Sequence, residues 1–402
     1  MKKVVLAYSG GLDTSVAIPW LVEQGYEVVA VAVDVGQPGD LDDAVTRATT
    51  LGAAESRLVD ARAPFVEGFV LPALMMNALY QGRYPLVSAL SRPLISQVLV
   101  DVAKETDATA VAHGCTGKGN DQVRFEVSLH ALAPELEVLA PVRDWDMNRE
   151  QTIEFALERD LPIRTTKASP YSIDENLWGR SIECGALEDP WTVPPEDAFA
   201  LTVHPDDAPA AREVEISFEG GAPVAVDGEH VDPQQAIEVL GKISGSYGFG
   251  RIDMIEDRLV GIKSREVYEA PGALALIAAH RDLEGLVLER NYAREKRRLE
   301  ALWADLAYEG LWFSPLREAI EAFAGTFEPH VTGEVRLRFA SGSCLPVARR
   351  AQASLYDHGL ATYDEGDAFD QSDAAGFIKL WGLPVEQWAK VHGRDVPPAS
   401  GR

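Results

Sequence analysis

The chain has 402 residues, of which 46% are hydrophobic and 25% charged, and its 63 acidic and 37 basic side chains give a formal net charge of −26. This length allows two domains and a terminal appendage. An acidic surface repels nucleic acids and anionic membranes, and the sequence has no run of about eighteen apolar residues. We therefore expect no nucleic-acid partner and no membrane span.

The first predicted element is a buried strand from Val4 to Tyr8, followed by the paired glycines Gly10 and Gly11. A helix then runs from about Thr14 to Gln24. Glycine lets the backbone bend sharply and come close to a ligand, and the free amides of a helix N-terminus lie at the positive end of its dipole. This strand, turn and helix predict a phosphate-binding site, although an ordinary turn would use the same glycines.

The turn lacks the Gly-Lys-Ser/Thr ending of a Walker loop. Residues 9–15 read Ser-Gly-Gly-Leu-Asp-Thr-Ser, which resembles the pyrophosphate loop of ATP pyrophosphatases. Enzymes of that superfamily split ATP between its α and β phosphates.

The cysteines Cys115, Cys184 and Cys344 form no CxxC pair and no metal-ligand spacing, which is typical of a reducing compartment. The sequence passes from Lys2 and Lys3 directly into the first strand, and a cleaved leader would remove the phosphate loop. We expect a cytoplasmic protein in which protein side chains hold no metal.

Strand and helix signals alternate through about residue 165, which predicts an α/β fold with a parallel sheet covered on both faces. Such sheets bind ligands at the carboxyl ends of their strands, where the glycine turn lies. Beyond the first helix, the predicted strands are Glu27–Val33, Arg57–Val59 and Ala110–His113, and the predicted helices are Leu41–Leu51, Pro93–Thr106 and Asn148–Arg159.

The segment after the strand at Ala110–His113 is a candidate ligand loop. Residues 113–126 hold three glycines interleaved with polar side chains, a composition that makes a poor core. Arg124 offers a planar fork for a carboxylate, and Asn120 can both donate and accept hydrogen bonds. A solvated loop without a ligand is the alternative interpretation.

The pattern changes after about Pro170. Five prolines between residues 188 and 212 predict a long loop, and the following segments predict an α+β domain. A helical tail from Ala374, with Trp381 and Trp388, is expected to pack on another subunit or domain. The expected divisions are a nucleotide-binding domain at 1–168, a synthetase domain at 169–360 and a C-terminal tail at 361–402. Within the second domain, the predicted strands are Glu213–Phe218, Val224–Val226 and Glu334–Phe339, and the predicted helices are Pro233–Leu240, Pro271–Leu283 and Glu289–Tyr308.

The two ligand loops together resemble those of argininosuccinate synthase, and the resemblance extends over nearly the whole chain. It implies a ligase that joins citrulline to aspartate with ATP and releases AMP and diphosphate. It also implies a synthetase domain that binds the amino acids and a C-terminal oligomerisation helix in a homotetramer. Further matching segments, in order, are 82–86, 91–93, 172–177, 250–253 and 261–265.

The resemblance also assigns site residues by position. ATP would be bound by Ala7, Tyr8, Ser9, Gly10, Gly11, Leu12, Asp13, Thr14, Ser15, Val33 and Gly114. Aspartate would be bound by Thr116, Asn120 and Asp121. Citrulline would be bound by Tyr84, Asn120, Arg124, Ser172, Ser181, Glu256 and Tyr268. Two positions depart from the family pattern: Ala89 replaces a serine, and Val33 replaces an alanine near the adenine.

The mechanism implied by the family needs no protein nucleophile. The ureido oxygen of citrulline attacks the α-phosphorus of ATP, and the aspartate amine then displaces AMP from the citrullyl-AMP intermediate. Catalysis would depend on positioning and on stabilisation of charge by the loop amides and Mg²⁺. We hypothesise that Lys118, Lys167 or Arg92 supplies the positive charge that a Walker lysine would supply. Asp13 would either support Mg²⁺ indirectly or bind backbone amides at the helix start.

Three other functions are weighed against this one. The nearest is another adenylating ligase with a pyrophosphate loop, such as a synthetase that makes NAD or GMP. A tRNA sulfur-transfer enzyme is disfavoured by the acidic charge and by the missing CxxC. A nucleotide-binding regulator without catalysis is the third.

Overall fold

The computed structural model describes residues 2–145, 147, 149–159, 161, 171–364 and 368–393. The chain forms two compact units, Met1–Ala353 and Ser354–Arg402. Within the described ranges, none of the helices combines the length and apolar character that crossing a bilayer requires.

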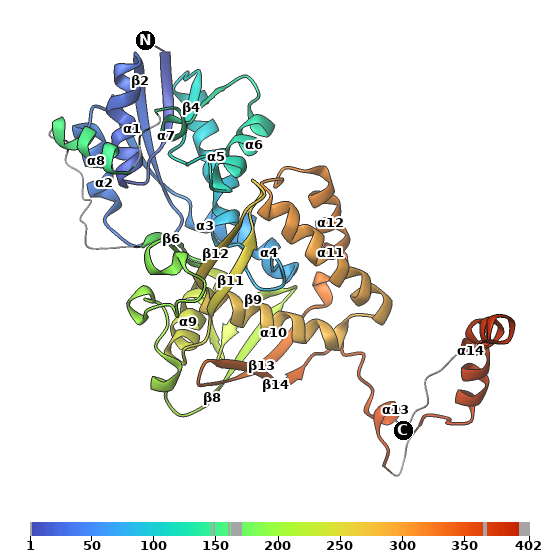
Figure 1. Ribbon diagram of the computed structural model, residues 1–402. Helices are drawn as coiled ribbons and strands as arrows, with labels where there is room; N and C mark the ends of the chain where they lie inside the picture. The colour runs from blue at the N-terminus through green and yellow to red at the C-terminus, as the bar shows by residue number, and fades with distance from the viewer. Residues whose placement is uncertain are drawn as a thin grey trace. The chain divides into compact units, whose positions relative to one another are not determined.

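The first part of the larger unit is built on a parallel sheet of five strands in the order β3-β2-β1-β4-β5. Alternate residues of the strands enter two different cores: Val5 and Val29 face one side, and Val4 and Val28 face the other. Helices α1 and α2 cover one side and α5 and α6 the other (Figure 1). The strands are β1 (Lys2–Ala7), β2 (Tyr26–Asp34), β3 (Glu55–Asp60), β4 (Ala110–Ala112) and β5 (Glu137–Leu139), and the helices are α1 (Leu12–Glu23), α2 (Leu41–Thr50), α5 (Val87–Glu105) and α6 (Asp121–Leu132).

This sheet confirms the predicted parallel fold with helices on both faces. The chain passes from β1 outward through β2 and β3, then returns to the other side of β1 with β4 and β5. The strand order therefore reverses between β1 and β4, which is where open α/β sheets bind ligands. The turn after β1 and the loop after β4 both lie at this edge.

In this part of the chain, two predicted boundaries are wrong by several residues. The helix expected from Pro93 begins six residues earlier, at Val87, after Leu86 with a left-handed φ of 64°. Burial of Val87, Leu90 and Leu94 keeps the helix continuous through Pro93, although the proline removes one backbone hydrogen bond. The ligand loop expected over 113–126 ends at Asn120, because α6 begins at Asp121.

Short helices complete this part of the chain. They connect β3 to α5 and follow β5. The elements are α3 (Arg62–Phe65), a π-helical turn η1 (Val66–Val70), α4 (Leu71–Met75), α7 (Pro141–Asp144) and α8 (Arg149–Glu158).

A second, antiparallel sheet of four strands has the order β11-β12-β7-β6. The sequence did not predict these strands, because they carry many polar side chains. The hairpin of β6 and β7 is joined to the first sheet by Leu177, whose amide donates to the Val35 carbonyl at 2.9 Å just beyond β2. The strands are β6 (Ser172–Asn176), β7 (Gly179–Glu183), β11 (Arg251–Asp257) and β12 (Lys263–Glu269).

The proline-rich segment that follows β7 is a loop, as predicted. It contains three short 3₁₀ turns and no strand or longer helix between residues 184 and 211. The turns are η2 (Gly185–Glu188), η3 (Glu196–Ala198) and η4 (Pro205–Asp207).

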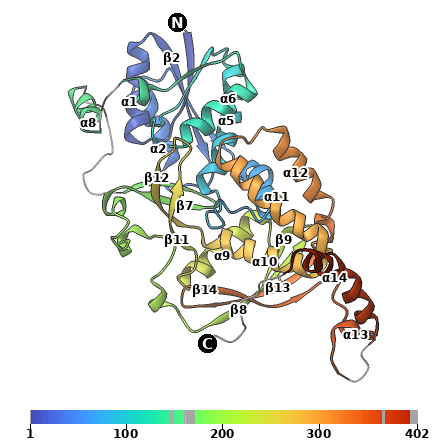
Figure 2. The ribbon, with the colours of Figure 1, turned by 45° about the vertical axis from the view of Figure 1, so that its right-hand side comes forward.

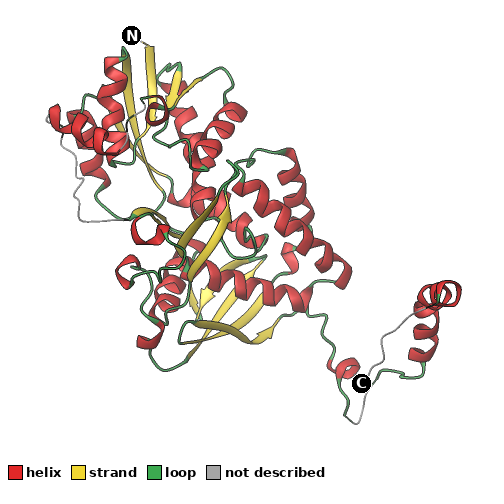
Figure 3. Ribbon diagram, in the orientation of Figure 1, coloured by secondary structure: helices red, strands yellow, loops and turns green. Residues whose placement is uncertain are grey.

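A third sheet, antiparallel and five-stranded, has the order β10-β9-β8-β13-β14. Helix α10 packs on β13 and β14 (Figure 3), and α11 packs against α12 (Figure 2). The strands are β8 (Arg212–Glu219), β9 (Ala222–Val226), β10 (Glu229–His230), β13 (Gly333–Ala340) and β14 (Ser343–Arg350), and the helices are α9 (Pro233–Ser246), α10 (Pro271–Val287), α11 (Arg290–Tyr308), α12 (Pro315–Gly325) and the 3₁₀ turn η5 (Glu328–His330).

The smaller unit contains α13 (His358–Ala361) and α14 (Asp373–His392). The helix predicted from Ala374 is therefore present. Its large apolar side chains are exposed, and they are Phe377, Ile378, Leu380, Trp381, Leu383, Val385, Trp388 and Val391.

A buried charge cluster joins α10 to α11. The Lys296 ammonium is 1% exposed and lies 2.6 Å from Glu284 Oε1 and 3.1 Å from Glu300 Oε1. Asn77, which follows α4, donates to both carboxylates at 2.7 and 2.9 Å. His280 Nδ1 bonds the side-chain oxygen Oδ1 of Asn77 at 2.9 Å, so the cluster connects three separate parts of the chain.

Replacing this lysine tests the importance of the cluster. Lys296→Met leaves two carboxylates buried without their cation, and we expect it to lower the free energy of unfolding by about 3–5 kcal/mol. Lys2→Met is the matched control, because Lys2 pairs with Glu137 at 3.6 Å with both side chains exposed. That change should cost less than about 1 kcal/mol. Denaturant titration measures both, and similar small losses would contradict the role of the cluster.

Candidate functional site

The turn between β1 and α1 has the geometry of a phosphate-binding loop. Gly10 adopts a φ of 74°, which favours glycine, and Gly11 is the N-cap of α1. The Gly11 amide donates to Ser9 Oγ at 3.3 Å, and that hydroxyl lies 3.1 Å from Thr14 Oγ1. Hydroxyls and helix N-terminal amides thus gather at the carboxyl edge of the sheet, where they suit an anionic ligand.

Arg47 of α2 makes hydrogen bonds to this turn. Its Nη2 donates to the Gly10 carbonyl at 3.3 Å and its Nε to the Tyr8 hydroxyl at 3.5 Å, while Nη1 pairs with Asp43 at 3.3 Å. Arg47 could not be recognised from the sequence, since it lies in an amphipathic helix far from the glycines along the chain. Its positive charge adds to that of the helix N-terminus beside it.

A cavity of about 430 Å³ opens in front of the turn. Its lining combines hydroxyl side chains of the phosphate turn with apolar side chains from the end of β2. Of the residues expected to bind ATP, its lining includes Ala7, Tyr8, Ser9, Thr14, Val33 and Gly114. The other expected ATP residues, Gly10, Gly11, Leu12, Asp13 and Ser15, belong to the same turn and first helical residues.

Glycine at position 114 permits the loop after β4 to approach α1. A Cβ on Gly114 would lie 2.7 Å from Thr14 Cγ2, closer than side chains normally approach. Within this loop, Thr116 and Lys118 are exposed. The Lys118 carbonyl accepts from Arg258 at 3.4 Å, and the amide of Leu259 donates to Asn120 at 3.0 Å. The hairpin between β11 and β12 therefore contacts the loop.

The Asp121 carboxylate at the start of α6 lies between two guanidinium groups. Arg92 of α5 pairs with it at 2.8 Å, and Arg124 pairs with it at 2.8 Å. Arg92 also pairs with Asp174 of β6 at 2.6 Å, and it lines the cavity. Burial alone would raise the pKa of Asp121, but the two guanidinium groups outweigh it and lower the pKa to about 2.

Glu256 is the centre of an aromatic cluster. It is 2% exposed and accepts from the hydroxyls of Tyr268 at 2.5 Å and Tyr308 at 2.7 Å. Tyr84 stacks on Tyr268 with ring centroids 4.2 Å apart. Burial raises the pKa of the Glu256 carboxyl above its ordinary value, although both hydroxyls stabilise the charged form.

Tyr308 connects this cluster to α6. Asn120 Nδ2 donates to its hydroxyl at 2.8 Å, and Arg124 Nε donates to its carbonyl at 2.9 Å. Gly310 allows the approach, because a Cβ there would lie 2.9 Å from the Arg124 Cα. Sequence reasoning missed Tyr308, since it appeared only as the last residue of a predicted helix.

The four-stranded sheet supplies the remaining predicted residues. Ser181 on β7 is opposite both Asp174 on β6 and Tyr268 on β12, so these three side chains share one face. Ser172 is exposed at the start of β6. Ala89, the departure from the family pattern, is buried in α5.

The structure thus brings together most of the predicted amino-acid site and places Arg92 between it and the cavity. Contacts link six of the predicted residues, directly or through Tyr308, and these are Tyr84, Asn120, Asp121, Arg124, Glu256 and Tyr268. Asp174 was also missed by the sequence analysis. Lys167, one of the candidate cations, lies outside the described residues.

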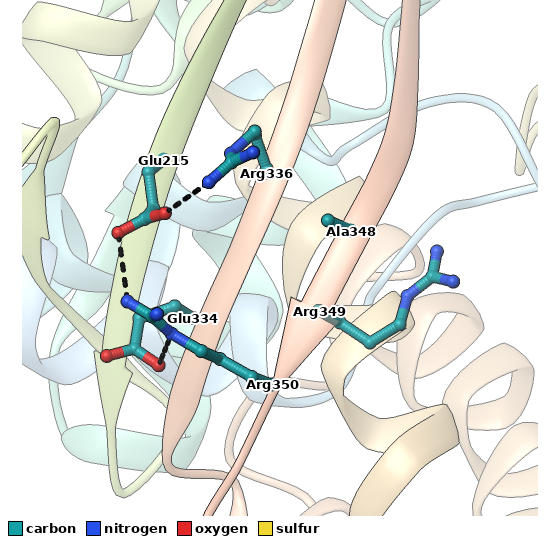
Figure 4. Close-up of a pocket in the computed structure, with 6 residues that line it drawn as sticks. All are labelled: Glu215, Glu334, Arg336, Ala348, Arg349 and Arg350. Atoms are coloured by element: carbon teal, nitrogen blue, oxygen red, sulfur yellow. Dashed lines mark hydrogen bonds and ion pairs between the residues drawn. The ribbon is translucent and has the colours of Figure 1, made fainter.

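A second hollow lies over β8, β13 and β14. It encloses about 70 Å³. Glu215 pairs with Arg336 at 3.2 Å and with Arg350 at 3.4 Å, and Arg350 also pairs with Glu334 at 3.0 Å (Figure 4). Arg349, the third guanidinium of its lining, pairs with Asp282 at 2.8 Å, so every charged side chain here already has a partner. We therefore assign the functional site to the larger cavity.

A parallel sheet with a glycine turn after its first strand and an adjoining polar cluster is typical of nucleotide-binding α/β proteins. Residues 3–162 match the family model described as Arginosuccinate synthase N-terminal HUP domain, and residues 171–388 match the one described as Arginosuccinate synthase C-terminal domain. The chain belongs to the argininosuccinate synthase family.

Curated relatives named argininosuccinate synthase match the chain over nearly its full length. That of Listeria monocytogenes is 54% identical over 394 residues, 98% of each chain. That of Oceanobacillus iheyensis is 54% identical over 394 residues, 98% of this chain and 94% of the relative. That of Halalkalibacterium halodurans is 55% identical over 392 residues, 97% of this chain and 96% of the relative.

The depressed pKa of Asp121 gives a test of its ion pairs. Because its folded pKa of about 2 lies below the ordinary 3.8, the stability it contributes is present above the ordinary value and is lost as pH falls toward 2. We expect Asp121→Asn to lower the free energy of unfolding by about 2 kcal/mol at neutral pH.

Denaturant titrations from pH 6 down to about pH 2 measure this difference, which should shrink as the wild-type carboxylate becomes protonated. Asp206→Asn is the control, since that side chain is 89% exposed. A difference between Asp121→Asn and wild type that stays constant with pH would contradict the assignment.

Proposed function

We propose that the chain catalyses the reaction of its family, the ATP-dependent ligation of citrulline and aspartate to argininosuccinate in arginine biosynthesis, with release of AMP and diphosphate. The observation that supports this proposal most directly is that one residue, Arg92, belongs both to the nucleotide cavity and to the amino-acid cluster. Arg92 lines the cavity beside the phosphate turn and also pairs with Asp121 and Asp174 of the amino-acid cluster. A nucleotide and an amino acid bound on the two sides of Arg92 would be neighbours.

ATP would lie along the cavity, with its phosphates on residues 7–15 and Gly114 and its adenine near Val33. The hydroxyls of the turn and the valines at the end of β2, which both line the cavity, support this orientation. Mg²⁺ would enter with the phosphates as part of the substrate, since Mg²⁺ is commonly bound through substrate oxygens. Within the described ranges, the only convergence of three metal-ligand side chains is the buried group of His280, Glu284 and Glu328, where Lys296 already supplies a cation.

The amino acids would occupy the cluster on the other side. Aspartate would be bound by Thr116, Asn120 and Asp121. For citrulline, the Arg124 guanidinium suits the α-carboxylate and the Glu256 carboxylate suits the α-ammonium, with Tyr84, Asn120, Ser172, Ser181 and Tyr268 as the other contacts. The interlinked hydrogen bonds of these groups support a fixed, preorganised site.

The chemistry would proceed by adenylation. The citrulline ureido oxygen attacks the α-phosphorus, diphosphate leaves, and the aspartate amine then displaces AMP from the activated carbon. The protein's part is to align the groups, which in well-oriented intramolecular reactions lowers the barrier by about 7–11 kcal/mol. Positive charge would come from Arg92, with Lys118 and Lys167 as further candidates.

We also propose the broader organisation implied by the family. The domain divisions are 1–168, 169–360 and 361–402, the protein is cytoplasmic, and the tail contributes to a homotetramer. The exposed apolar side chains of α14 support an intermolecular role for this helix.

The reaction itself is tested by product formation. We expect AMP and diphosphate to accumulate only when ATP, citrulline and aspartate are all present. Exchange of labelled diphosphate into ATP should require citrulline but not aspartate. Chromatography and isotope counting measure both. Hydrolysis to ADP, or exchange without citrulline, would contradict the proposed function.

Two glycine variants provide a matched control for the phosphate turn. Gly10→Ala strains a φ of 74° and places a Cβ 2.9 Å from Arg47 Nη2, so it should lower kcat/KM for ATP by about 10- to 100-fold. Gly25→Ala imposes similar strain at a φ of 84° with no atom within 4 Å, and should leave that value nearly unchanged.

The pH dependence tests the role of Glu256. Because burial raises its pKa, the carboxylate is lost at a higher pH than an ordinary glutamate, and kcat/KM for citrulline should fall with it as pH decreases. We expect Glu256→Gln to lower this value about 30-fold or more and to remove that acid limb, since the amide carries no charge for the ammonium.

Steady-state rates at saturating ATP and aspartate measure the effect, and Glu219→Gln at the exposed end of β8 is the control. An unchanged acid limb in Glu256→Gln would contradict the assignment.

A further inference from the structure

At the end of β2, the backbone edge on the β1 side faces the cavity, and β1 does not pair with it beyond Val31. The last hydrogen bond from β1 to this edge is from the Tyr8 amide to the Val31 carbonyl at 2.9 Å, whereas pairing with β3 continues to Asp34. Because backbone groups alternate in direction along a strand, Val33 and Val35 direct theirs to the β1 side. Both residues line the cavity.

The side chain of Gln37 is hydrogen-bonded to these backbone groups. Its Nε2 donates to the Val33 carbonyl at 2.8 Å, and its Oε1 accepts from the Val35 amide at 2.8 Å. One carboxamide therefore makes hydrogen bonds to a backbone carbonyl and a backbone N–H that lie two residues apart on the same edge. Gln37 is itself part of the cavity lining.

A carboxamide and the Watson–Crick edge of adenine have the same arrangement of polar groups. Each presents an N–H donor beside an acceptor. In the carboxamide these are the amide N–H and the carbonyl oxygen, and in adenine they are the amino group and the ring nitrogen next to it. The cavity around Gln37 is also suited to a flat base, because Val31, Pro38, Ile95 and Ile173 line it. The two ligands would compete for the same two hydrogen bonds.

We propose that Gln37 is an internal competitor of adenine: its carboxamide holds the backbone pair of Val33 and Val35 and withdraws when the nucleotide binds. This inference rests on the proposed ATP site. The backbone would stay in place, because the Gly36 amide is held by Asp34 at 2.8 Å and the Val35 carbonyl by Leu177 at 2.9 Å. Rotation of one side chain is then sufficient to free the edge.

The competition has a defined consequence for affinity. Adenine must replace the hydrogen bonds that Gln37 already makes to the backbone of Val33 and Val35. Its binding is therefore weaker than its own contacts alone would give. Gln37→Met keeps the length of the side chain and removes both hydrogen bonds, and it should therefore tighten AMP binding about 3- to 10-fold. Diphosphate, which has no base, should bind with unchanged affinity.

Isothermal titration of the full chain with AMP and with diphosphate measures both affinities. Gln234→Met is the matched control, since Gln234 bonds Glu238 at the surface of α9. Should Gln37→Met fold poorly, Gln37→Ala removes the same amide and must change AMP binding in the same direction.

Unchanged or weaker AMP binding in the Gln37 variants would overturn the proposal, and weaker binding of both ligands would assign Gln37 a structural role in the turn. A wild-type protein that binds neither AMP nor diphosphate would instead overturn the proposed function. The two failures are therefore distinguishable.

Discussion

The position of the Asp121 carboxylate between Arg92 and Arg124 is the constraint on which the site depends. These ion pairs connect α5, α6 and, through Asp174, the four-stranded sheet. Two buried guanidinium groups without this carboxylate would carry a large desolvation penalty. The same pairs give the nucleotide cavity and the amino-acid cluster a common wall, so the fold and the proposed chemistry rely on the same few contacts.

The cluster around Glu256 shows how the site differs from the core. Lys296, Glu284 and Glu300 form a closed group in which cation and carboxylates satisfy each other. Within the described part of the chain, the Glu256 carboxylate instead accepts its hydrogen bonds from the hydroxyls of Tyr268 and Tyr308, and burial raises its pKa. A buried carboxylate without a paired cation is suited to receive a cationic group of a ligand.

The sequence predicted the parallel sheet and the glycine turn after its first strand well, because periodic apolar residues and paired glycines are local signals. Strands β6, β7, β11 and β12 were missed, since one face carries the polar side chains of the site and hides the usual alternation. Tyr308, Asp174, Arg47 and Gln37 were missed for another reason. Their roles depend on partners distant in the sequence or on the local geometry at the end of β2, and neither is visible in a motif.

The central claim is that the ureido oxygen of a citrulline held beside Arg92 reaches the α-phosphorus of an ATP held by the first turn. The most direct measurement uses citrulline labelled with ¹⁸O in its ureido group, followed by mass spectrometry of the products of one turnover. The account predicts that the label appears in AMP. Label found in diphosphate or in water, with none in AMP, would contradict it.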